Sequence, residues 1–434
     1  MKAFLIIFLL SPVFTFAQGL YFPPKTGDLW DTISPQSLNW CQNNIDSLFG
    51  FLEESNTHSF ILLKDGKIVL EKYFGTNNQN SIWYWASAGK TLTAFMVGIA
   101  QQEKYLSISD TVSKYLGKGW TNCTAQQEEK ITIRHQLTMT SGLDDGGPDP
   151  FCTLPNCLNY KADAGTRWAY HNAPYTLLDK VIENATGSNL NGYITQKLKN
   201  QTGITGLFMP VDYNNIFFSN ARSMARFGLL TLNRGVWDDT PIMKDSAYFD
   251  EMTRTSQNLN QAYGYLWWLN STSTFMLPQT QLLFKGQISP NAPFDMFAAM
   301  GKNGQFINVV PSQNLVWVRM GDTPDNLDVP FILNDQIWQR INRLGCNPLQ
   351  TRKMRIDTNL VSIFPNPVND FLSINSENLI VKIEFYDYQG HILKYFEIRT
   401  NEKTISMIQF STGMYIMKIY FSDGKVTTEK VIKE

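Results

Sequence analysis

Residues 82–91 read IWYWASAGKT and lead into an apolar run, LTAFMVGIA, at residues 92–100. The run predicts a buried helix, because apolar residues occupy most of its circumference. Ser87 and Lys90 fall at the first turn, three residues apart, so their side chains share one face of the helix. Burial lowers the pKa of a lysine, which would let Lys90 take the serine proton, and free N–H groups at a helix start favour an oxyanion. The segment therefore predicts a serine nucleophile activated by a lysine.

Other interpretations of this segment are weaker or structural. A phosphate-binding loop would need a glycine where Tyr84 stands, and a nucleophile elbow would need one where Trp85 stands. The structural alternative is that Ser87 caps a core helix while Lys90 is solvated, since serine is common at helix starts.

The composition limits the class of protein. The 434 residues predict two or three domains. The formal net charge is -1 and no basic block occurs, which argues against a nucleic-acid partner. Charged residues make up 17% and aromatic residues 13% of the chain, which favours a large packed core with aromatic-lined clefts over disorder.

The N-terminus predicts export. A basic start precedes an apolar run at residues 4–16, and small residues precede Gln18, so residues 1–17 are expected to be a signal peptide. The run is too short for a membrane span, and no later stretch reaches that length, so no transmembrane span is expected after the signal is removed.

Export makes the five cysteines candidates for disulfide bonds. Cys152 and Cys157 flank a short loop and could pair. Cys41 and Cys346 lie near the two ends of the main domain and could join them, which leaves Cys123 over. The alternative is that these are free buried thiols.

Residues 18–346 predict one α/β (α+β) domain. Strands are expected near both ends and helices in the middle, so one antiparallel sheet would be built from both termini around a helical subdomain, with a cleft between the two. The expected strands are 59–63, 67–74, 297–300, 306–310 and 315–320, and the expected helices include segments before residue 57, before Gly187, at 221–232 and at 332–344. An acidic loop at residues 143–150 lacks the spacing of an EF-hand, so no metal site is expected.

Residues 347–358 have the polar, proline-containing composition of a linker. Residues 359–434 then alternate short apolar segments with turn signals, which predicts a small all-β sandwich. Seven short strands are expected: 361–364, 371–374, 380–386, 392–398, 404–408, 414–421 and 426–432.

Two further motifs bear chemically useful groups. In Trp168-Ala169-Tyr170-His171-Asn172, the tyrosine could relay a proton once a nearby ammonium stabilises its phenolate. The Asn172 amide could orient a lysine and a substrate carbonyl. The alternative for Tyr170 is a packed aromatic residue with a satisfied hydroxyl.

The second motif spans residues 301–305, GKNGQ, before an apolar strand. The Lys302 cation could bind a substrate carboxylate or lower a neighbouring pKa. Its glycines permit close backbone approach, and the N–H of Gln305 could be a second oxyanion donor. The alternative is a β-turn with an exposed lysine.

The order of the three motifs resembles a known family. Ser-x-x-Lys on a helix, then Tyr-x-Asn, then Lys-x-Gly before a strand is the pattern of serine β-lactamases and penicillin-binding proteins. Segments 131–143, 225–230 and 263–268 are also similar to family segments, so the resemblance covers about residues 55–343. It is closest to the class C-related branch, which includes esterases, D-aminopeptidases and 6-aminohexanoate-dimer hydrolases.

The resemblance implies a role for each matched residue. Ser87 would be the acylated nucleophile and Lys90 would hold its proton network. Tyr170 would act as general base and acid, helped by Asn172 or Lys302.

The oxyanion hole would be formed by the N–H groups of Ser87 and Gln305, with Asn303 and Gly304 beside it at the substrate. Asn303 stands where many lactamases have threonine, and it lacks the hydroxyl that often meets a β-lactam carboxylate. This departure weighs against β-lactamase activity.

A histidine-based triad is the competing catalytic arrangement. The pattern above needs none of the four histidines, so a structural role is expected for each: His58, His135, His171 and His391.

Five tryptophans could line the cleft and favour apolar acyl groups, with core packing as the alternative: Trp83, Trp85, Trp168, Trp267 and Trp268.

The C-terminal segment also resembles a known domain. The stretches FPNPV at 364–368, YDYQGH at 386–391 and STGMYI at 411–416 are similar to the type IX secretion sorting domain of Bacteroidetes. The resemblance implies an export signal read by the secretion machinery, then removed or attached at the cell surface. The alternative is a carbohydrate-binding or adhesive domain.

Together these observations predict a secreted or cell-surface serine hydrolase that needs no cofactor or metal and cleaves a small ester, amide or peptide through an acyl-enzyme. Its expected partners are that substrate and the type IX secretion machinery. Two alternatives stay open: a D-amino-acid peptidase of the penicillin-binding type, and an inactive relative that binds cell-wall peptides, which His171 and Asn303 motivate.

Overall fold

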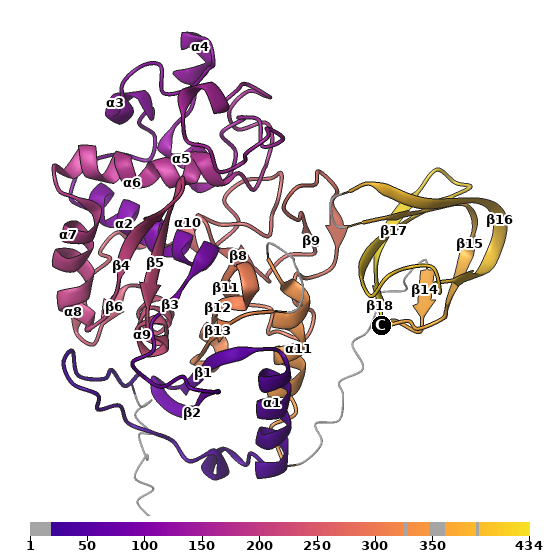
Figure 1. Cartoon of the computed structure of the whole chain (residues 1–434), viewed down its shortest axis with the longest axis horizontal. Coiled ribbons are helices and arrows are strands. Elements are labelled where there is room, and N and C mark those ends of the chain that lie inside the picture. The colour runs from indigo at the N-terminus through magenta and orange to yellow at the C-terminus, as the bar shows by residue number, and fades with distance from the viewer. Residues whose placement is uncertain (1–18, 324–328, 347–360, 388–389) are drawn as a thin grey trace, which may run out of the picture.

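The computed structural model describes residues 19–323, 329–346, 361–387 and 390–434. The chain forms a larger α/β domain, which ends near residue 346, and an all-β domain from residue 361 (Figure 1). The expected signal peptide, residues 1–17, and the expected linker, residues 347–358, lie outside the described residues.

A six-stranded antiparallel sheet organises the larger domain, with the strand order β2-β1-β13-β12-β11-β8. Its strands are β1 (Thr57–Lys64), β2 (Lys67–Tyr73), β8 (Trp268–Leu269), β11 (Phe297–Gly301), β12 (Gln305–Val310) and β13 (Leu315–Gly321). β1 pairs with β13, from Ser59 opposite Met320 to Lys64 opposite Leu315. The sheet therefore joins the two ends of the domain, which confirms the expected architecture.

Helices cover the sheet, and this explains why every residue of β12 and β13 is buried. α9 (Ala221–Leu232) packs closely on the sheet at Gly228, where an added Cβ would lie 2.5 Å from Val316 Cγ1. α1 (Gln42–Glu54) packs on α11 (Phe331–Ile341), and both lie beside β1 and β13 in Figure 1. The Cys41–Cys346 disulfide joins the residues that flank these two helices.

The middle of the chain forms the helical subdomain around α2 (Lys90–Gln102) and α6 (Asn172–Thr186), which pack on each other. α6 ends at Gly187, whose φ of 70° is the left-handed conformation that glycine adopts without steric cost. The shorter helices are α3 (Ser113–Leu116), α4 (Ala125–Glu128), α5 (Ile133–Leu137), α7 (Leu190–Ile194), α8 (Asn200–Thr202) and α10 (Ser246–Met252).

Small sheets complete this domain. β3 (Trp83–Tyr84), β5 (Asn214–Ser219) and β4 (Leu207–Val211) form a three-stranded sheet in that order. The hairpins are β6 (Val236–Trp237) with β7 (Thr240–Pro241), and β9 (Thr274–Phe275) with β10 (Phe284–Lys285). A second disulfide joins Cys152 and Cys157, so both expected pairings are present, and Cys123 is a free thiol.

The all-β character of the C-terminal domain is confirmed, but the expected count of seven strands is wrong. The described strands are five: β14 (Val361–Phe364), β15 (Phe371–Tyr386), β16 (Ile392–Ser406), β17 (Gly413–Phe421) and β18 (Val426–Lys433). Two pairs of predicted strands merge, because polar residues that resemble turns, such as Asn375 opposite Glu402, stay paired in the ladder. Register shifts after Asn375 accompany the bend of this sheet over its own apolar core.

The helices of the described ranges are all too short, or too polar, to span a lipid bilayer.

Arg319 is a fully buried cation of β13 that ties several loops to the sheet. Its guanidinium donates to the Thr57 hydroxyl and to four backbone carbonyls, those of Ser55, Asn303, Gly304 and Asp322. A buried charge is tolerated when its donors are satisfied in this way. Arg319 therefore links the start of β1 to the turn between β11 and β12.

We expect Arg319→Met to lower the free energy of unfolding by about 3 kcal/mol or more, because it leaves buried carbonyls without donors. Urea denaturation followed by circular dichroism measures this change. Arg254, whose side chain is 72% exposed, provides the control: Arg254→Met should change the same quantity by less than about 0.5 kcal/mol. Equal effects of the two substitutions would contradict the role of Arg319.

Candidate active site

Ser87 lies in a single 3-10 turn, residues Ala86–Gly89, immediately before α2. The preceding Trp85 is fully buried, its indole donates to Ser219 Oγ at 2.7 Å, and its backbone N–H donates to the Phe217 carbonyl at 2.8 Å. Ala86 adopts a φ of 47°, in the left-handed region that costs a non-glycine residue about 1–2 kcal/mol. Such strain persists where the surrounding structure fixes the backbone, as Trp85 does here.

Lys90 is 2% exposed and points back toward this turn. Its Nζ lies 2.8 Å from Ser87 Oγ and 2.7 Å from Asn172 Oδ1. The same nitrogen lies 4.0 Å from the centroid of the Tyr175 ring and 5.1 Å from that of Tyr170. The structure thus brings together four residues of the predicted site, Ser87, Lys90, Tyr170 and Asn172, from two motifs far apart in sequence.

Tyr170 is held by aromatic side chains. Its ring stacks on Trp268 at 5.6 Å between centroids and meets Tyr263 edge to face at 6.2 Å. Trp168 contacts all three rings. This packing fixes the direction of the phenol, which is 8% exposed as a residue.

Sequence reasoning missed Tyr175, whose ring lies under the Lys90 ammonium. Its signal was available, because Tyr175 follows Asn172 by three residues on a helix and so shares its face.

The tryptophans mostly pack the core. Trp85, Trp168, Trp267 and Trp268 are at most 1% exposed, whereas Trp83 is half-buried and stacks near Tyr84. The core-packing alternative therefore holds for four of the five. Trp168 and Trp268 pack against Tyr170, and Trp85 anchors the Ser87 turn, whereas Trp267 packs on Phe227 and Phe297.

The third motif meets the Ser87 turn through Gly301, the last residue of β11. A Cβ on Gly301 would lie 2.7 Å from the Trp85 carbonyl oxygen, 2.9 Å from Ala88 N and 3.0 Å from Ser87 N. Only glycine permits this contact, because real Cβ atoms do not approach backbone atoms so closely.

The backbone N–H groups of β11 point alternately to its two edges, and this alternation identifies those that face the site. The Met296 carbonyl accepts a hydrogen bond from Asn270, on the side of β8, and successive residues of a strand alternate between its two edges. Residues 298, 300 and 302 therefore direct their N–H groups to this edge, whereas Gly301 faces its partner Gln305 in β12. The Gln305 N–H, predicted as the second oxyanion donor, therefore faces Gly301 within the ladder rather than the site.

The side chains of residues 302–305 have no described contact with Ser87. Lys302 is exposed, and Asn303 donates to the Tyr84 hydroxyl at 2.7 Å and to Asp322. Gly304 has a φ of 75° above the Arg319 guanidinium. The Gln305 amide is buried on the backbone of Gly321. The described contacts thus place Asn172 beside Lys90 and give the Lys302 ammonium no ion pair.

His171, between Tyr170 and Asn172, is 4% exposed. Burial lowers its pKa to about 4. It is therefore neutral at neutral pH. It occupies the N-cap position of α6, near Asp144 and Asp145 of the acidic loop.

A buried carboxyl group lies deeper between the two helices that hold the site. Asp179 of α6 accepts hydrogen bonds from Thr93 of α2 at 3.2 Å and from Asn215 of β5 at 2.9 Å. Burial raises its pKa to about 7.

A cavity of about 550 Å³ opens beside the cluster. Its lining includes Tyr170 and Asn172, together with Pro278 and Gln279. His391 of the C-terminal domain also lines it. The aspartates of the acidic loop are paired in this lining: Asp144 with Lys161 at 3.4 Å and Asp145 with Arg167 at 2.7 Å.

Comparison with known proteins agrees with this arrangement. The family model described as Beta-lactamase matches residues 54–339. The model described as Secretion system C-terminal sorting domain matches residues 362–434, so the C-terminal domain indicates type IX secretion to the cell surface or outside.

Curated relatives are distant. An uncharacterized protein of Alkalihalophilus pseudofirmus is 25% identical over 299 residues, which cover 60% of this chain and 82% of that protein. Protein flp of Staphylococcus aureus is 29% identical over 157 residues, which cover 32% of this chain and 31% of flp. The match to flp thus spans about a third of either protein.

Solved structures share the fold. A Bacillus anthracis protein described provisionally as a 6-aminohexanoate-dimer hydrolase has a TM-score of 0.57 and 19% identity, covering 75% of this chain and 90% of its own. A family VIII carboxylesterase has a TM-score of 0.50 and 15% identity, covering 69% and 96%. At these identities the likeness shows the fold alone.

We expect Gly301→Ala to slow acylation of Ser87 about a hundredfold, because displacing the Ser87 turn by even 1 Å misaligns the reacting atoms. The rate of labelling by a fluorophosphonate probe measures this. Gly50→Ala is the control, since a Cβ there has no neighbour within 4 Å. If Gly301→Ala labels as fast as Gly50→Ala, the close contact does not position the nucleophile.

Asp179 generates a pH-dependent prediction. Between about pH 4 and pH 7 this carboxyl keeps its proton in the folded protein but loses it on unfolding, so its contribution to stability falls as pH rises through that window. We expect Asp179→Asn to gain stability relative to wild type as pH rises from about 4 to about 7. Urea unfolding across this range measures the difference, with exposed Asp239→Asn as the control. A constant difference between Asp179→Asn and wild type would refute the raised pKa.

Proposed function

This chain belongs to the Beta-lactamase family, and on that premise we propose that it is a secreted serine hydrolase that cleaves an ester or amide bond through an acyl-enzyme on Ser87. One observation carries the proposal: the buried Lys90 ammonium bridges Ser87 Oγ at 2.8 Å and Asn172 Oδ1 at 2.7 Å. A serine that only capped a helix would not need a buried lysine on its hydroxyl oxygen.

In acylation, Ser87 Oγ attacks the carbonyl carbon of the substrate and its proton passes to Tyr170. The proton acceptor is the Tyr170 phenolate, and the Lys90 ammonium near that ring favours its presence in the free enzyme, because a nearby positive charge stabilises the anion. Tyr170 then returns the proton to the leaving alcohol or amine as the bond to the carbonyl carbon breaks. Water repeats the sequence on the acyl-enzyme, releasing the acid and restoring Ser87.

The oxyanion of each tetrahedral intermediate would accept hydrogen bonds from the N–H groups of Ser87 and Lys302. The alternation of N–H direction along β11 supports Lys302 in place of Gln305, and the close approach of Gly301, the residue before Lys302, to Ser87 N supports the pairing of these two donors. Two preorganised donors of this kind typically account for a large share of the rate enhancement.

The ester or amide class is supported by two structural neighbours, one described provisionally as a 6-aminohexanoate-dimer hydrolase and the other as a family VIII carboxylesterase. A β-lactam is a weaker candidate substrate, because the Asn303 amide is engaged by Tyr84 and Asp322 and carries no hydroxyl for a carboxylate. The N-terminal segment would direct the chain to the periplasm, from which the sorting domain directs it outward.

We expect Ser87→Ala to reduce hydrolysis of p-nitrophenyl acetate by about a thousandfold or more, since loss of a nucleophile removes the whole acyl-enzyme route. Intact-mass measurement should show one adduct after a fluorophosphonate probe in wild type and none in the variant. The exposed Ser109→Ala variant should behave as wild type. Turnover that survives Ser87→Ala would refute the mechanism, and binding of the probe without an adduct would indicate an inactive binding relative.

A further inference from the structure

Phe151 is an aromatic side chain exposed at the candidate active site. It lines the same cavity as Tyr170 and Asn172, and it is 39% exposed. Asn172 is bonded to Lys90 and Lys90 to Ser87, so this cavity lies two hydrogen bonds from the nucleophilic oxygen. A large apolar surface left open at such a place is suited to bind an apolar part of a substrate.

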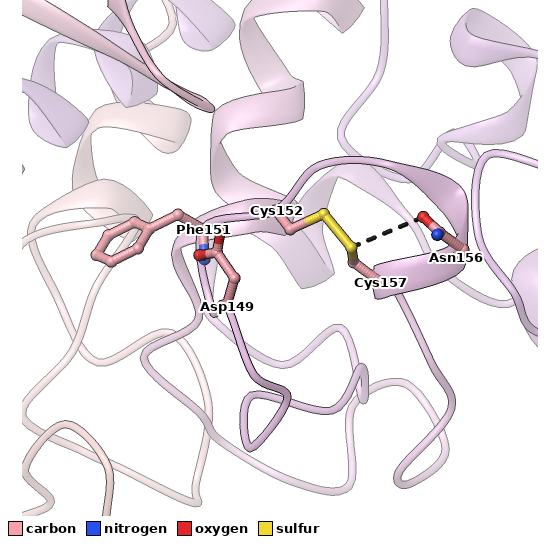
Figure 2. The surroundings of a disulfide bond; sticks show 5 residues. All are labelled: Asp149, Phe151, Cys152, Asn156 and Cys157. Atoms are coloured by element: carbon pink, nitrogen blue, oxygen red, sulfur yellow. Dashed lines mark hydrogen bonds between the residues drawn. A yellow bond between two sulfur atoms is a disulfide. The ribbon is translucent and has the colours of Figure 1, made fainter.

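The loop that carries Phe151 is fixed at several points. The Cys152–Cys157 disulfide closes it directly after Phe151, and Figure 2 shows the ring directed away from the sulfur atoms. The Phe151 N–H donates to Asp149 Oδ1 at 2.9 Å, and the Cys152 N–H donates to the Asp149 carbonyl at 3.3 Å. An exposed ring on so short and closed a loop loses little conformational entropy when a ligand packs on it.

The loop is also hydrogen-bonded to α6, the helix that begins at Asn172. The Pro150 carbonyl accepts a hydrogen bond from the N–H of Ala173, the residue after Asn172. The position of Phe151 is therefore set relative to Asn172 and Lys90 rather than by the loop alone.

The charges around this cavity are mutually compensated. Asp145 pairs with Arg167 and Asp144 with Lys161, so these four groups add no net charge to the wall. Shape and apolar contact, rather than charge, would then distinguish one substrate from another. The apolar residues of its lining include Pro150, Phe151 and Pro278.

We propose that Phe151, positioned by the Cys152–Cys157 disulfide, is the specificity-determining residue of this site and selects substrates with a bulky apolar group next to the scissile bond. This inference rests on the proposed serine hydrolase function and deepens it. Trp85, Trp168, Trp267 and Trp268 are buried in the core, so Phe151, together with Pro150 and Pro278, provides the apolar contact that the substrate meets.

The test compares p-nitrophenyl acetate with p-nitrophenyl esters of longer and aromatic acids, using the full chain. We expect Phe151→Ala to lower kcat/KM for the bulky esters about tenfold or more, because each apolar contact in a pocket is worth a large factor in discrimination. The value for acetate should stay within about twofold, because the acetyl group has no bulky apolar part for the ring to contact. Phe151→Leu should restore part of the preference.

Two further variants separate the contact from the restraint. Cys152→Ser with Cys157→Ser keeps the ring but frees its loop, and we expect it to reduce the same preference by raising KM for the bulky esters. Phe294→Ala removes a ring that is 65% exposed and does not line the cavity, so it should leave all the esters unchanged.

The outcomes are distinct. An unchanged ratio of bulky to acetyl ester in Phe151→Ala, or an equal loss for both, would overturn the proposal. Failure of the proposed function would instead appear in wild type, as the absence of any Ser87 adduct. If the variant without the disulfide keeps the preference for bulky esters while Phe151→Ala loses it, only the positioning role of the disulfide is overturned.

Discussion

The buried ammonium of Lys90 is the constraint on which the rest of the site depends. An ammonium taken out of water costs several kcal/mol unless its N–H groups are bonded and its charge is compensated. Lys90 meets this requirement with Ser87 Oγ, with Asn172 Oδ1 and with the face of Tyr175. These partners come from the turn before α2 and from α6, so the charge can be accommodated only after the two segments have packed on each other.

A second buried cation fixes the opposite side of the nucleophile. Arg319 holds the carbonyls of Asn303 and Gly304, and through them the turn that follows Gly301. Gly301 in turn lies against the backbone of Ser87. The nucleophile is thus placed between two elements, and each is anchored by a buried cation whose donors are bonded there.

Much of this could be predicted from the sequence, and the misses have physical reasons. The spacing of Ser87 and Lys90 on a helix, and the glycine before Lys302, are local features that survive without coordinates. The sequence predicts Gln305 as the second oxyanion donor, but the edge that an N–H group faces depends on where the hairpin turns, and a shift by one residue exchanges the two edges of a strand. Likewise, Trp268 and Trp83 are equally apolar in sequence, and only the sheet decides that one packs under Tyr170 while the other stays half exposed.

The two disulfides differ in loop length and therefore in their effect on the fold. Cys41–Cys346 spans 305 residues, and a cross-link over so long a loop stabilises a fold by about 6 kcal/mol in the chain-entropy model. Cys152–Cys157 spans five residues and contributes about 2 kcal/mol in the same model. A bond that adds so little to global stability acts mainly on local geometry. This local order affects two neighbouring groups, the Phe151 ring at the cavity and the Pro150 carbonyl that accepts a hydrogen bond from α6.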